Sequence, residues 1–274
     1  MTAADAFEMA SQTHPGKVRS HNEDSFACVP NLGLAILADG MGGYNAGEVA
    51  SGICVSLLEA ELREALGGGN PRGEGTSWSA AAEGLLREHV LRANSSVYRA
   101  AQSKPEYAGM GTTLVMGLFR EGQVTVAHIG DSRLYRLRGD ALEQLTRDHS
   151  LLQEQIDSGI ITPEQARVSQ NRNLVTRALG VESFVEPEIR SYDVKGDDVY
   201  LFCSDGLNDM VRDEEIRRAL MTMQSNLNLA ANHLVDMAND AGGRDNVSVI
   251  LVKVRHESAP QRRMATRLWS WLRT

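Results

Sequence analysis

The stretch AILADGMGGYNAGEVA, from Ala35 to Ala50, runs from apolar residues into Asp39 and then into four closely spaced glycines. Glycine loses more conformational freedom on folding than any other residue, so this density indicates a sharp turn or a close backbone approach. Asp39 could simply cap a helix that begins after the turn. It could also be a ligand, with the glycines making room for what it binds.

Similar junctions of apolar runs and acids recur along the chain. Predicted strands end at Asp39, Asp131 and Asp205, whereas two others, SFACV and NVSVILVKV, begin just after Asp24 and Asp245. Strand ends of opposite polarity meet at one edge only when neighbouring strands are antiparallel. A site shared by these acids therefore requires a largely antiparallel sheet.

Helical patterns lie between the strands. Apolar residues recur at helical spacing over residues 46–66, 78–101 and 227–239, and GGGNPRGEGTS is the predicted loop between the first two helices. No repeat or shift in composition marks a domain boundary within the 274 residues. The pattern alone predicts a single α/β domain with strands as its core and helices outside.

Composition narrows the class of protein. A net charge of −8 and a pI near 5.4 disfavour a nucleic-acid-binding protein. No apolar run reaches the roughly 18 residues of a membrane span, and no signal-peptide pattern opens the sequence. Cys28, Cys54 and Cys203 lie in apolar runs and are predicted to be buried free thiols in a reducing compartment. We therefore expect a cytoplasmic protein.

Convergence of the acids would demand a counter-charge. Asp39, Asp131, Asp205 and Asp245 would repel one another at neutral pH unless protons or cations offset the repulsion. Oxygen ligands without cysteine or histidine clusters suit Mg²⁺ or Mn²⁺, and bridging carboxylates hold two such ions about 3.5–4 Å apart. The alternative is that each aspartate caps a turn or helix, which is common for one Asp-Gly pair but harder to sustain for five strand-end acids.

A candidate phosphate ligand lies nearby in GKVRSHNED, where Arg19 precedes the acidic pair Glu23–Asp24. A guanidinium beside two metal ions can bind phosphate in bidentate fashion. The alternative for Arg19 is an ordinary surface ion pair.

Taken in order, these motifs resemble those of bacterial members of the metal-dependent protein phosphatase family, the type 2C serine/threonine phosphatases. Eight motifs carry the resemblance: GKVRSHNED (16–24), DGMGGYNAGEVAS (39–51), GTTLV (111–115), HIGDSRLYRL (128–137), LTRDHSL (145–151), TRALG (176–180), CSDGLNDMV (203–211) and GGRDNVSVILV (242–252). Their order along most of the chain makes the resemblance specific.

The resemblance implies a four-layer α-β-β-α sandwich of two antiparallel sheets with a centre of two or three Mg²⁺ or Mn²⁺ ions at one end. It implies in-line attack by a water bound to two ions on phosphoserine or phosphothreonine, with no covalent phosphoenzyme. The expected substrates are phosphoproteins, including a cognate serine/threonine kinase and its targets. We expect a monomer that binds no nucleic acid.

Residue roles follow from the same resemblance. Asp39 would bridge two ions, and the Gly40 carbonyl, Asp205 and Asp245 would complete their ligands. The acidic pair Glu23–Asp24 would reach the ions directly or through water, with Asp24 also assigned a catalytic role. Asp131 would help to hold a third ion, and Arg19 would bind the substrate phosphate.

One position departs from eukaryotic relatives, which carry a histidine after the aspartate–glycine pair as the proposed general acid. Here that residue is Met41, so the leaving group must receive its proton from water or from another group. His21 and His149 lie within motifs, and both are predicted to be structural.

The phosphatase domain is predicted to span residues 1–256, with a flap over about 150–172. This flap contains two short helical patterns, and the alternative is a surface excursion without a role. Residues 257–274 form a basic amphipathic extension, suited to an anionic membrane surface or a partner groove. A tail that is disordered or docked on its own domain is the alternative.

Two other functions fit part of the pattern. A two-metal phosphodiesterase or nuclease would use similar ligands, but the acidic pI and the motif order disfavour it. A pseudophosphatase that only binds phosphoproteins would be expected to lack some metal-binding acids, yet all of them are present.

Overall fold

The computed structural model describes residues 6–43, 46–67, 76–167, 169 and 174–255. The predicted extension at 257–274 lies outside the described residues, as do parts of the glycine-rich turn and of the flap. Within the described ranges, no helix has the length and apolar character needed to cross a membrane.

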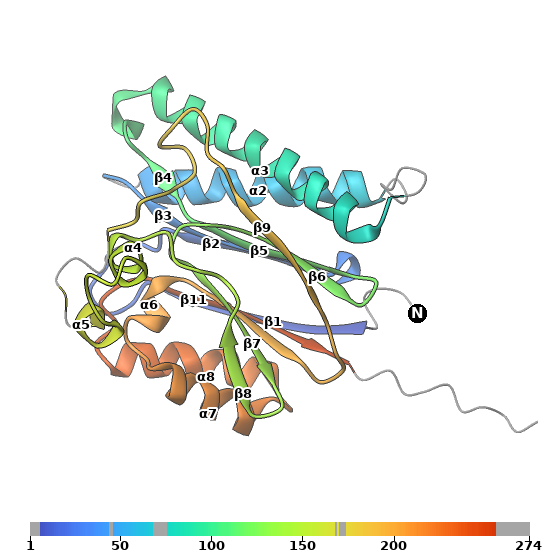
Figure 1. Cartoon of the computed structure of the whole chain (residues 1–274). Helices are drawn as coiled ribbons and strands as arrows, with labels where there is room; N and C mark the ends of the chain where they lie inside the picture. The colour runs from blue at the N-terminus through green and yellow to red at the C-terminus, as the bar shows by residue number, and fades with distance from the viewer. Residues whose placement is uncertain (1–5, 44–45, 68–75, 168, 170–173, 256–274) are drawn as a thin grey trace, which may run out of the picture.

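Two antiparallel sheets form the centre of the molecule (Figure 1). The first has the order β1-β11-β10-β7-β8, with bounds Phe7–His14, Val247–Val254, Val199–Cys203, Arg133–Arg138 and Ala141–Gln144. The second has the order β2-β3-β5-β6-β9, with bounds Asp24–Val29, Leu34–Met41, Leu114–Arg120, Gln123–Ile129 and Glu188–Asp193. The short strand β4 (Gly111–Thr112) pairs with the end of β3. All the described pairings are antiparallel, as the polarity of the strand-end acids requires.

Helices cover the outer face of each sheet (Figure 1). The antiparallel pair α2 (Ala46–Gly67) and α3 (Trp78–Ser103) packs on the second sheet, whereas α7 (Asp213–Met223) and α8 (Leu227–Asp240) pack on the first. Ser77 and Asn226 begin α3 and α8 by accepting backbone N–H groups in the first turn. The expected four-layer α-β-β-α sandwich, an α+β fold, is confirmed.

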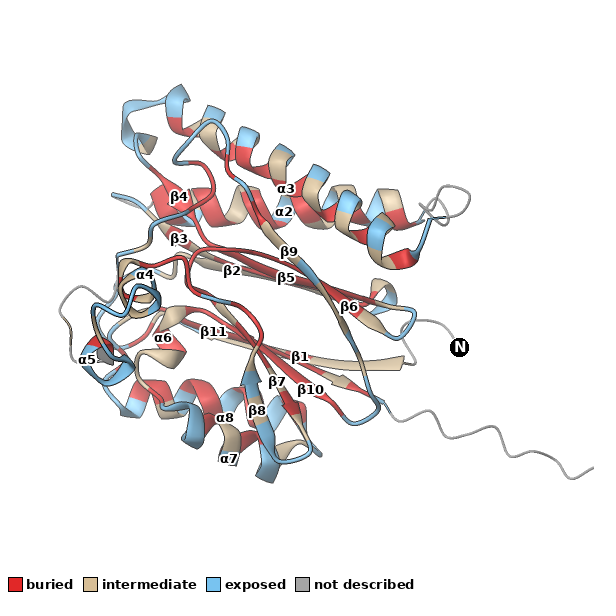
Figure 2. Ribbon diagram, viewed as in Figure 1, coloured by how far each residue is buried: buried red, intermediate tan, exposed pale blue. Residues whose placement is uncertain are grey.

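Strand alternation produces three apolar layers. In β3, Leu34, Ile36 and Ala38 face α2, while Ala35 and Leu37 face the other sheet. Both faces of the central strands are therefore buried, as the red strands of Figure 2 show. For this reason the sequences of these strands are continuous apolar runs and do not alternate between apolar and polar residues.

The layer between the sheets depends on aromatic packing. The Phe119 ring meets Tyr200 edge-on with a centroid separation of 5.0 Å, and Phe202 lies beside it. A Cβ at Gly117 would lie 2.7 Å from the Phe202 ring, so the absence of a side chain there lets the sheets approach. This packing fixes the relative positions of the strand ends that carry the acids.

The remaining elements are short. The 3₁₀ turns Pro30–Leu32 and Pro105–Tyr107 lie in connections, whereas α4 (Leu151–Asp157), α5 (Pro163–Arg167) and α6 (Asp205–Asn208) gather at one end of the sandwich (Figure 1). The two predicted helices of the flap correspond to α4 and α5. The end of the molecule that carries these short helices also carries the site described below.

The cysteine prediction is confirmed for two residues. Cys54 and Cys203 are buried free thiols, and Cys28 is a half-buried free thiol. Burial raises the pKa of Cys28 to about 11, so the thiol stays protonated at neutral pH.

Asp198 ties the first sheet together at the end opposite the site. It is buried, and its carboxylate accepts hydrogen bonds from Arg138 at 2.8 and 2.7 Å and from the Lys195 backbone at 2.8 Å. Burial acts to raise the pKa of Asp198, but these donors outweigh it and hold the pKa below its usual value.

We predict that Asp198→Asn lowers the free energy of unfolding by about 1–3 kcal/mol at neutral pH. Because the folded-state pKa is depressed, this stabilisation is present above the ordinary aspartate pKa and is lost as pH falls through the folded value. Urea unfolding at pH 7 and in acid measures the difference from wild type. The exposed Asp193→Asn is the matched control and should change little, and an Asp198→Asn effect that stays constant down to the acid limit would contradict the assignment.

Candidate metal centre

The predicted acids converge where the two sheets end. Asp24 and Asp39 are directly paired across β2 and β3, and Asp205 opens α6 just after β10. Asp245 lies two residues before β11, and Asp131 two residues after β6. Electrostatic repulsion from the other four carboxylates contributes to raising the pKa of Asp39, which places all five at one site.

Burial makes this repulsion severe. Desolvation is the largest cause of the raised pKa at each of the four most enclosed carboxylates, with neighbouring acids adding to it. It raises the pKa of Asp24 to about 6 and that of Asp131 to about 7, and the pKa values of Asp39 and Asp205 lie well above the usual range. Without a cation, the site binds protons near neutral pH.

The donor set fits a hard divalent cation. Asp24 Oδ1 and Asp205 Oδ1 are buried and have no hydrogen-bond partner among the described residues. An unpaired buried carboxylate oxygen is costly, and a bound cation removes that cost. The atoms gathered here are carboxylate and carbonyl oxygens, which Mg²⁺ and Mn²⁺ prefer.

Two glycines let strand and helix approach closely beside the acids. A Cβ at Gly40 would lie 2.1 Å from the Gly47 carbonyl oxygen and 2.6 Å from the Glu23 carbonyl oxygen. A Cβ at Gly47 would lie 2.8 Å from the Glu23 carboxyl carbon. Because Gly40 and Gly47 lack side chains, the end of β3 lies directly against α2, and the side chain of Glu23 lies at this contact.

The acidic pair Glu23–Asp24 is divided between two environments. Asp24 accepts a hydrogen bond from Ser204 Oγ at 2.9 Å, which anchors it toward the other sheet. Glu23 lies against Gly47; burial raises its pKa, and Arg19 opposes that rise. Both carboxylates border the site, so both stay candidates for direct ligation.

Arg19 lies at the edge of the centre. Its guanidinium donates to Asp245 Oδ2 at 2.7 Å, and both side chains are partly exposed. This hydrogen bond is the main cause of the raised pKa of Arg19, and Glu23 and Asp205 add to it. A guanidinium held in this way is positioned to meet an anion that approaches the acids from solvent.

Three further residues support the ligands: Asn246, which motif inspection left unassigned, and Thr112 and Thr113, which the sequence predicts to be structural turn and strand residues. Asn246 donates to the carbonyls of Pro15 and His21 and accepts the Glu23 N–H at 2.8 Å, so one side chain joins the N-terminal loop to Asp245. Thr113 Oγ1 accepts the Asp39 N–H at 3.0 Å, and Thr112 donates to the Asp39 carbonyl at 2.9 Å. Asn246 could have been noticed beside Asp245 in RDN (244–246), whereas Thr112 and Thr113, in GTT (111–113), have no acid beside them in the sequence.

The loop of Asp131 is tied to the base of the flap. Arg133 donates to both oxygens of Asp148, with a closest distance of 2.6 Å, and Gln144 donates to the same carboxylate. The His149 N–H donates to the Gly130 carbonyl at 2.8 Å. Asp131 is therefore held by a loop whose conformation depends on the residues at the start of the flap.

His128, His149 and Glu188 form a second cluster with metal-like spacing, with ligand atoms within 4.8 Å of one another. The Gly130 N–H donates to His149 Nδ1, which leaves the proton on Nε2, the atom that faces Glu188. Burial lowers the pKa of His149 and keeps it neutral. This geometry is that of a structural histidine, as expected, whereas His21 is exposed.

Two antiparallel sheets flanked by helices, with carboxylates gathered at one end, fit the metal-dependent phosphatases that the sequence motifs resemble. The family model described as Protein phosphatase 2C matches residues 13–239, and the chain belongs to this family. It is accordingly a serine/threonine protein phosphatase by class.

The two relatives described next are bacterial. The serine/threonine phosphatase stp of Listeria welshimeri is 38% identical over 248 residues, covering 88% of this chain and 94% of that protein. Protein phosphatase PhpP of Streptococcus pneumoniae is 34% identical over 262 residues, covering 92% and 99%.

Solved structures agree in fold. The serine/threonine phosphatase PstP/Ppp of Mycobacterium tuberculosis superposes with a TM-score of 0.82 at 38% identity, covering 92% of this chain and 100% of that one. The PstP catalytic domain in complex with two manganese ions gives a TM-score of 0.78 at 37% identity, covering 91% and 99%.

The raised pKa values predict a pH-dependent stability of the metal-free protein. Between about pH 4 and pH 7 the folded chain binds more protons than the unfolded chain, so stability falls as pH rises through this window. We predict that the gain in Tm on adding Mn²⁺ is larger at pH 8 than at pH 5.5. Thermal melts with Mn²⁺ or with chelator measure it, and Asp131→Asn should lose part of the pH dependence; an equal gain at both pH values would contradict it.

Proposed function

We propose that this protein hydrolyses phosphoserine and phosphothreonine in proteins with the aid of Mg²⁺ or Mn²⁺ held by the carboxylate centre. The observation that carries the proposal is the convergence of five carboxylates, with two buried oxygens unpaired, in a chain of the protein phosphatase 2C family. The two manganese ions named for the PstP catalytic domain support the choice of metal.

The ligand assignment follows the positions of the acids. Asp39, central in the electrostatic network, would hold both ions, and the adjoining Gly40 carbonyl would join it. Asp205 and Asp245 would complete the set. Glu23 and Asp24 would complete the shell directly or through water, and Asp131 would help to hold a third ion. Bound divalent ions supply an activated water for in-line attack and neutralise charge on the phosphoryl group.

The protein's own residues bind and orient the substrate. Arg19 binds the phosphate oxygens, and its hydrogen bond to Asp245 positions the guanidinium to do so. Asp24, with one oxygen fixed by Ser204, keeps a second oxygen turned into the site. Met41, half-buried at the end of β3, donates no proton, so the departing alkoxide takes its proton from water or from another group. No cysteine nucleophile takes part.

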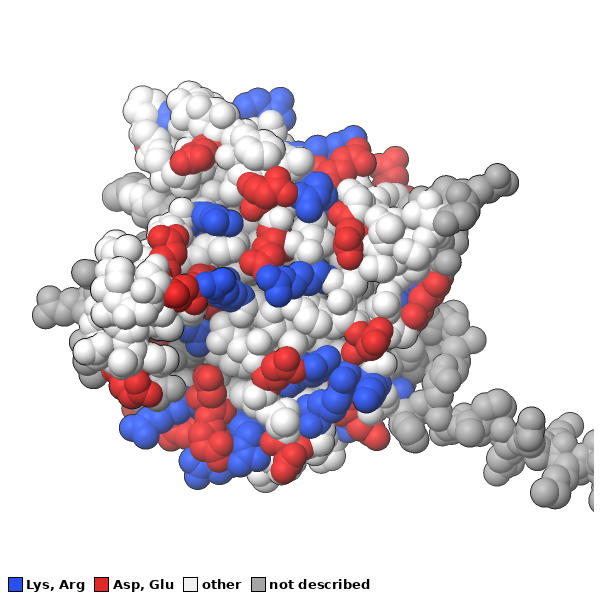
Figure 3. Space-filling view, viewed as in Figure 1, with Lys and Arg blue, Asp and Glu red and all other residues white. Residues whose placement is uncertain are grey.

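The protein's setting is part of the proposal. The substrates are phosphoproteins, among them a cognate bacterial kinase and its targets. On the face drawn in Figure 3, Lys/Arg and Asp/Glu side chains are interspersed, which supports the absence of nucleic acid among its partners. We further propose a cytoplasmic monomer with a catalytic domain over 1–256, and a tail at 257–274 that contacts a partner or membrane surface.

Asp205→Asn should lower kcat/KM on a phosphothreonine peptide by about 100-fold or more, because one ligand oxygen loses its charge. The assay compares Mn²⁺ with chelator, and the wild type should be active only with the ion. The exposed Asp140→Asn, in the β7–β8 hairpin, should keep wild-type activity. Wild-type protein that turns over nothing with Mn²⁺, or an equally active Asp205→Asn, would overturn the proposal.

Arg19→Ala should raise KM for the same peptide by about tenfold, because it removes a charged phosphate ligand, whereas metal binding should persist. Lys17→Ala is the matched control, since Lys17 is an exposed cation two residues away that pairs with Asp240. An unchanged KM in Arg19→Ala would show that Arg19 serves only as an ion pair with Asp245.

A further inference from the structure

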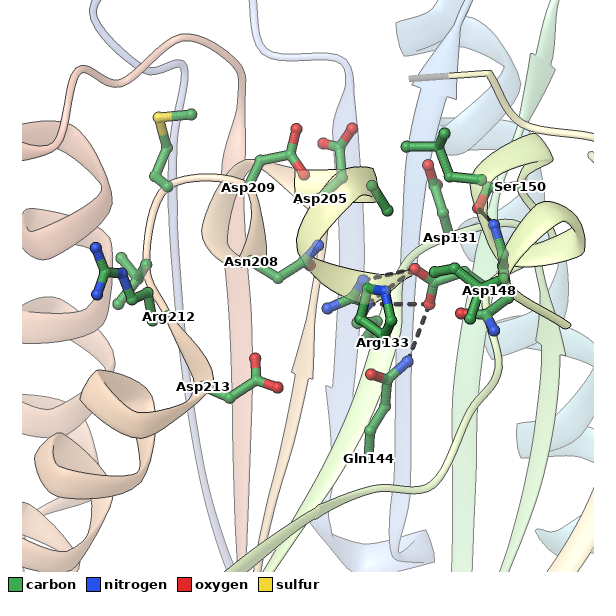
Figure 4. A pocket seen from close by; sticks show the side chains of 17 residues that line it. Asp131, Arg133, Gln144, Asp148, Ser150, Asp205, Asn208, Asp209, Arg212 and Asp213 are labelled. Carbon is green, nitrogen blue, oxygen red and sulfur yellow. Dashed lines mark hydrogen bonds and ion pairs between the residues drawn. The ribbon is translucent and has the colours of Figure 1, made fainter. Parts of the chain in front are cut away.

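The carboxylates of the centre have different surroundings. Asp131 and Asp205 line a cavity of about 530 Å³ that opens between the flap and the segment that follows β10 (Figure 4). Asp24 is not part of this lining. Its Oδ1 is buried without a hydrogen-bond partner among the described residues, whereas its Oδ2 accepts the Ser204 hydroxyl at 2.9 Å. The orientation of Asp24 is therefore set by the side chains around it.

Two hydroxyl groups lie at the metal end of the layer between the sheets. Ser248 in β11 is fully buried, and it shares the strand face of Ile250 and Val252, which pack between the sheets. Thr13 is its direct partner across β1 and β11, and the two hydroxyl oxygens are 2.7 Å apart. A buried hydroxyl is costly unless it is hydrogen-bonded, so hydroxyls on this otherwise apolar face indicate a polar partner nearby.

That partner is Asp24, to which two serines donate hydrogen bonds. Burial raises the pKa of Asp24 to about 6, and hydrogen bonds from Ser248 and Ser204 oppose this rise. Ser204 Oγ accepts the Ser248 N–H at 3.0 Å, which leaves the Ser204 proton for Asp24 Oδ2. One serine lies in β11 and the other just after β10, whereas Asp24 begins β2, so these bonds join the two sheets at the centre.

Asn22 closes a ring of hydrogen bonds around Asp24. Its Oδ1 accepts the Asp24 backbone N–H at 3.2 Å, which identifies Nδ2 as the donor to Thr13 Oγ1 at 2.7 Å. Because the single hydroxyl proton of Ser248 is directed at a charged carboxylate, Thr13 donates to Ser248. The ring therefore runs in one direction, from the Asp24 N–H through these three side chains to the Asp24 carboxylate.

We propose that the three side chains of this ring, together with Ser204, are positioning residues of the metal centre, an inference that rests on the proposed function. The four residues are Thr13, Asn22, Ser204 and Ser248. They hold the Asp24 carboxylate in one orientation and leave Oδ1 free to meet a divalent ion, directly or through water. Residues that orient a metal ligand in this way contribute to metal affinity without touching the ion.

A similar hydroxyl pair elsewhere in the molecule provides a matched control. Thr125 in β6 and Ser191 in β9 also lie across neighbouring strands, with hydroxyl oxygens 3.1 Å apart. Ser191 donates to Glu83 in α3, on the outer face of the second sheet. Loss of this pair affects packing between a sheet and a helix, whereas loss of the pair in β1 and β11 also affects Asp24.

Calorimetric titration with Mn²⁺ tests the proposal in Thr13→Val, which keeps the shape of the side chain and removes the hydroxyl. The Kd for Mn²⁺ should rise by about tenfold, because Asn22 and Ser248 both lose the partner that fixes them. Thr13→Ser keeps the hydroxyl and should bind Mn²⁺ as the wild type does. Thr125→Val should lower stability and leave the Kd unchanged.

Three results would overturn the proposal: wild-type affinity in Thr13→Val, an equal loss in Thr13→Ser, or an equal loss in Thr125→Val. The second and third would show that loosened packing, and not the missing hydroxyl, weakens binding. Thermal melts of the metal-free variants establish that each is folded at the titration temperature. If Thr13→Val does not fold, Ser204→Ala removes one donor to Asp24 and carries the same prediction.

Hydrolysis of p-nitrophenyl phosphate separates this inference from the function on which it rests. In Thr13→Val the Mn²⁺ concentration that gives half the maximal rate should rise with the Kd, whereas KM for the ester should stay at the wild-type value because Arg19 is untouched. If the wild type binds Mn²⁺ and hydrolyses the ester while Thr13→Val responds to Mn²⁺ in the same way, the ring assignment alone fails. If the wild type neither binds Mn²⁺ nor hydrolyses the ester, both proposals fail.

Discussion

Repulsion among carboxylates buried together at one end of the sandwich is the constraint on which the rest of the structure depends. Asp24 and Asp39 face each other across adjacent strands, and like charges directly opposite destabilise a sheet. The folded chain tolerates this arrangement because protons occupy the site when cations do not, as the raised pKa values indicate. A site that is unfavourable when empty and charged binds divalent ions strongly, and this is the property that phosphoryl transfer needs.

The scaffold opposes this repulsion with packing on every side. Three apolar layers hold the sheets and helices in place, and the aromatic cluster between the sheets fixes one set of strand ends against the other. Near the acids, hydrogen bonds fix the backbone. Thr113 accepts the Asp39 N–H, and Asn246 joins the N-terminal loop to Asp245. The carboxylates cannot move apart without breaking these contacts, so their separation is set before any ion binds.

Much of this arrangement can be predicted from the sequence because the acidic site residues lie at the ends of recognisable strands. The acids at 39, 131 and 205 follow apolar runs, and the opposed polarity of Asp24 and Asp245 predicts the antiparallel pairing that the sheets have. The helices 46–67 and 227–240 begin at the predicted residues because apolar periodicity is a local signal. Position within the strand is less predictable: β3 continues through Asp39 to Met41, and β2 begins at Asp24 itself.

Features that depend on contacts between distant segments of the chain could not be predicted from the sequence. The helical pattern over residues 46–66 does not show which side chains are most buried. Leu58 is fully buried, whereas Val49, Ile53 and Leu57 are half-buried, and the smaller Ala50 and Cys54 pack in the core because α2 approaches β3 closely. The edge strands β8 and β9 carry too few apolar residues to stand out. The cavity beneath the flap joins residues from three separate segments, and no spacing in the sequence reveals it.

Calorimetric titration of the metal-free protein with Mn²⁺ tests the central claim most directly. The account predicts at least two ions bound per chain with release of protons near neutral pH, and a loss of binding in Asp39→Asn, because that carboxylate is proposed to hold both. A folded wild-type protein that binds no Mn²⁺, or an Asp39→Asn variant that binds it as the wild type does, would contradict the account.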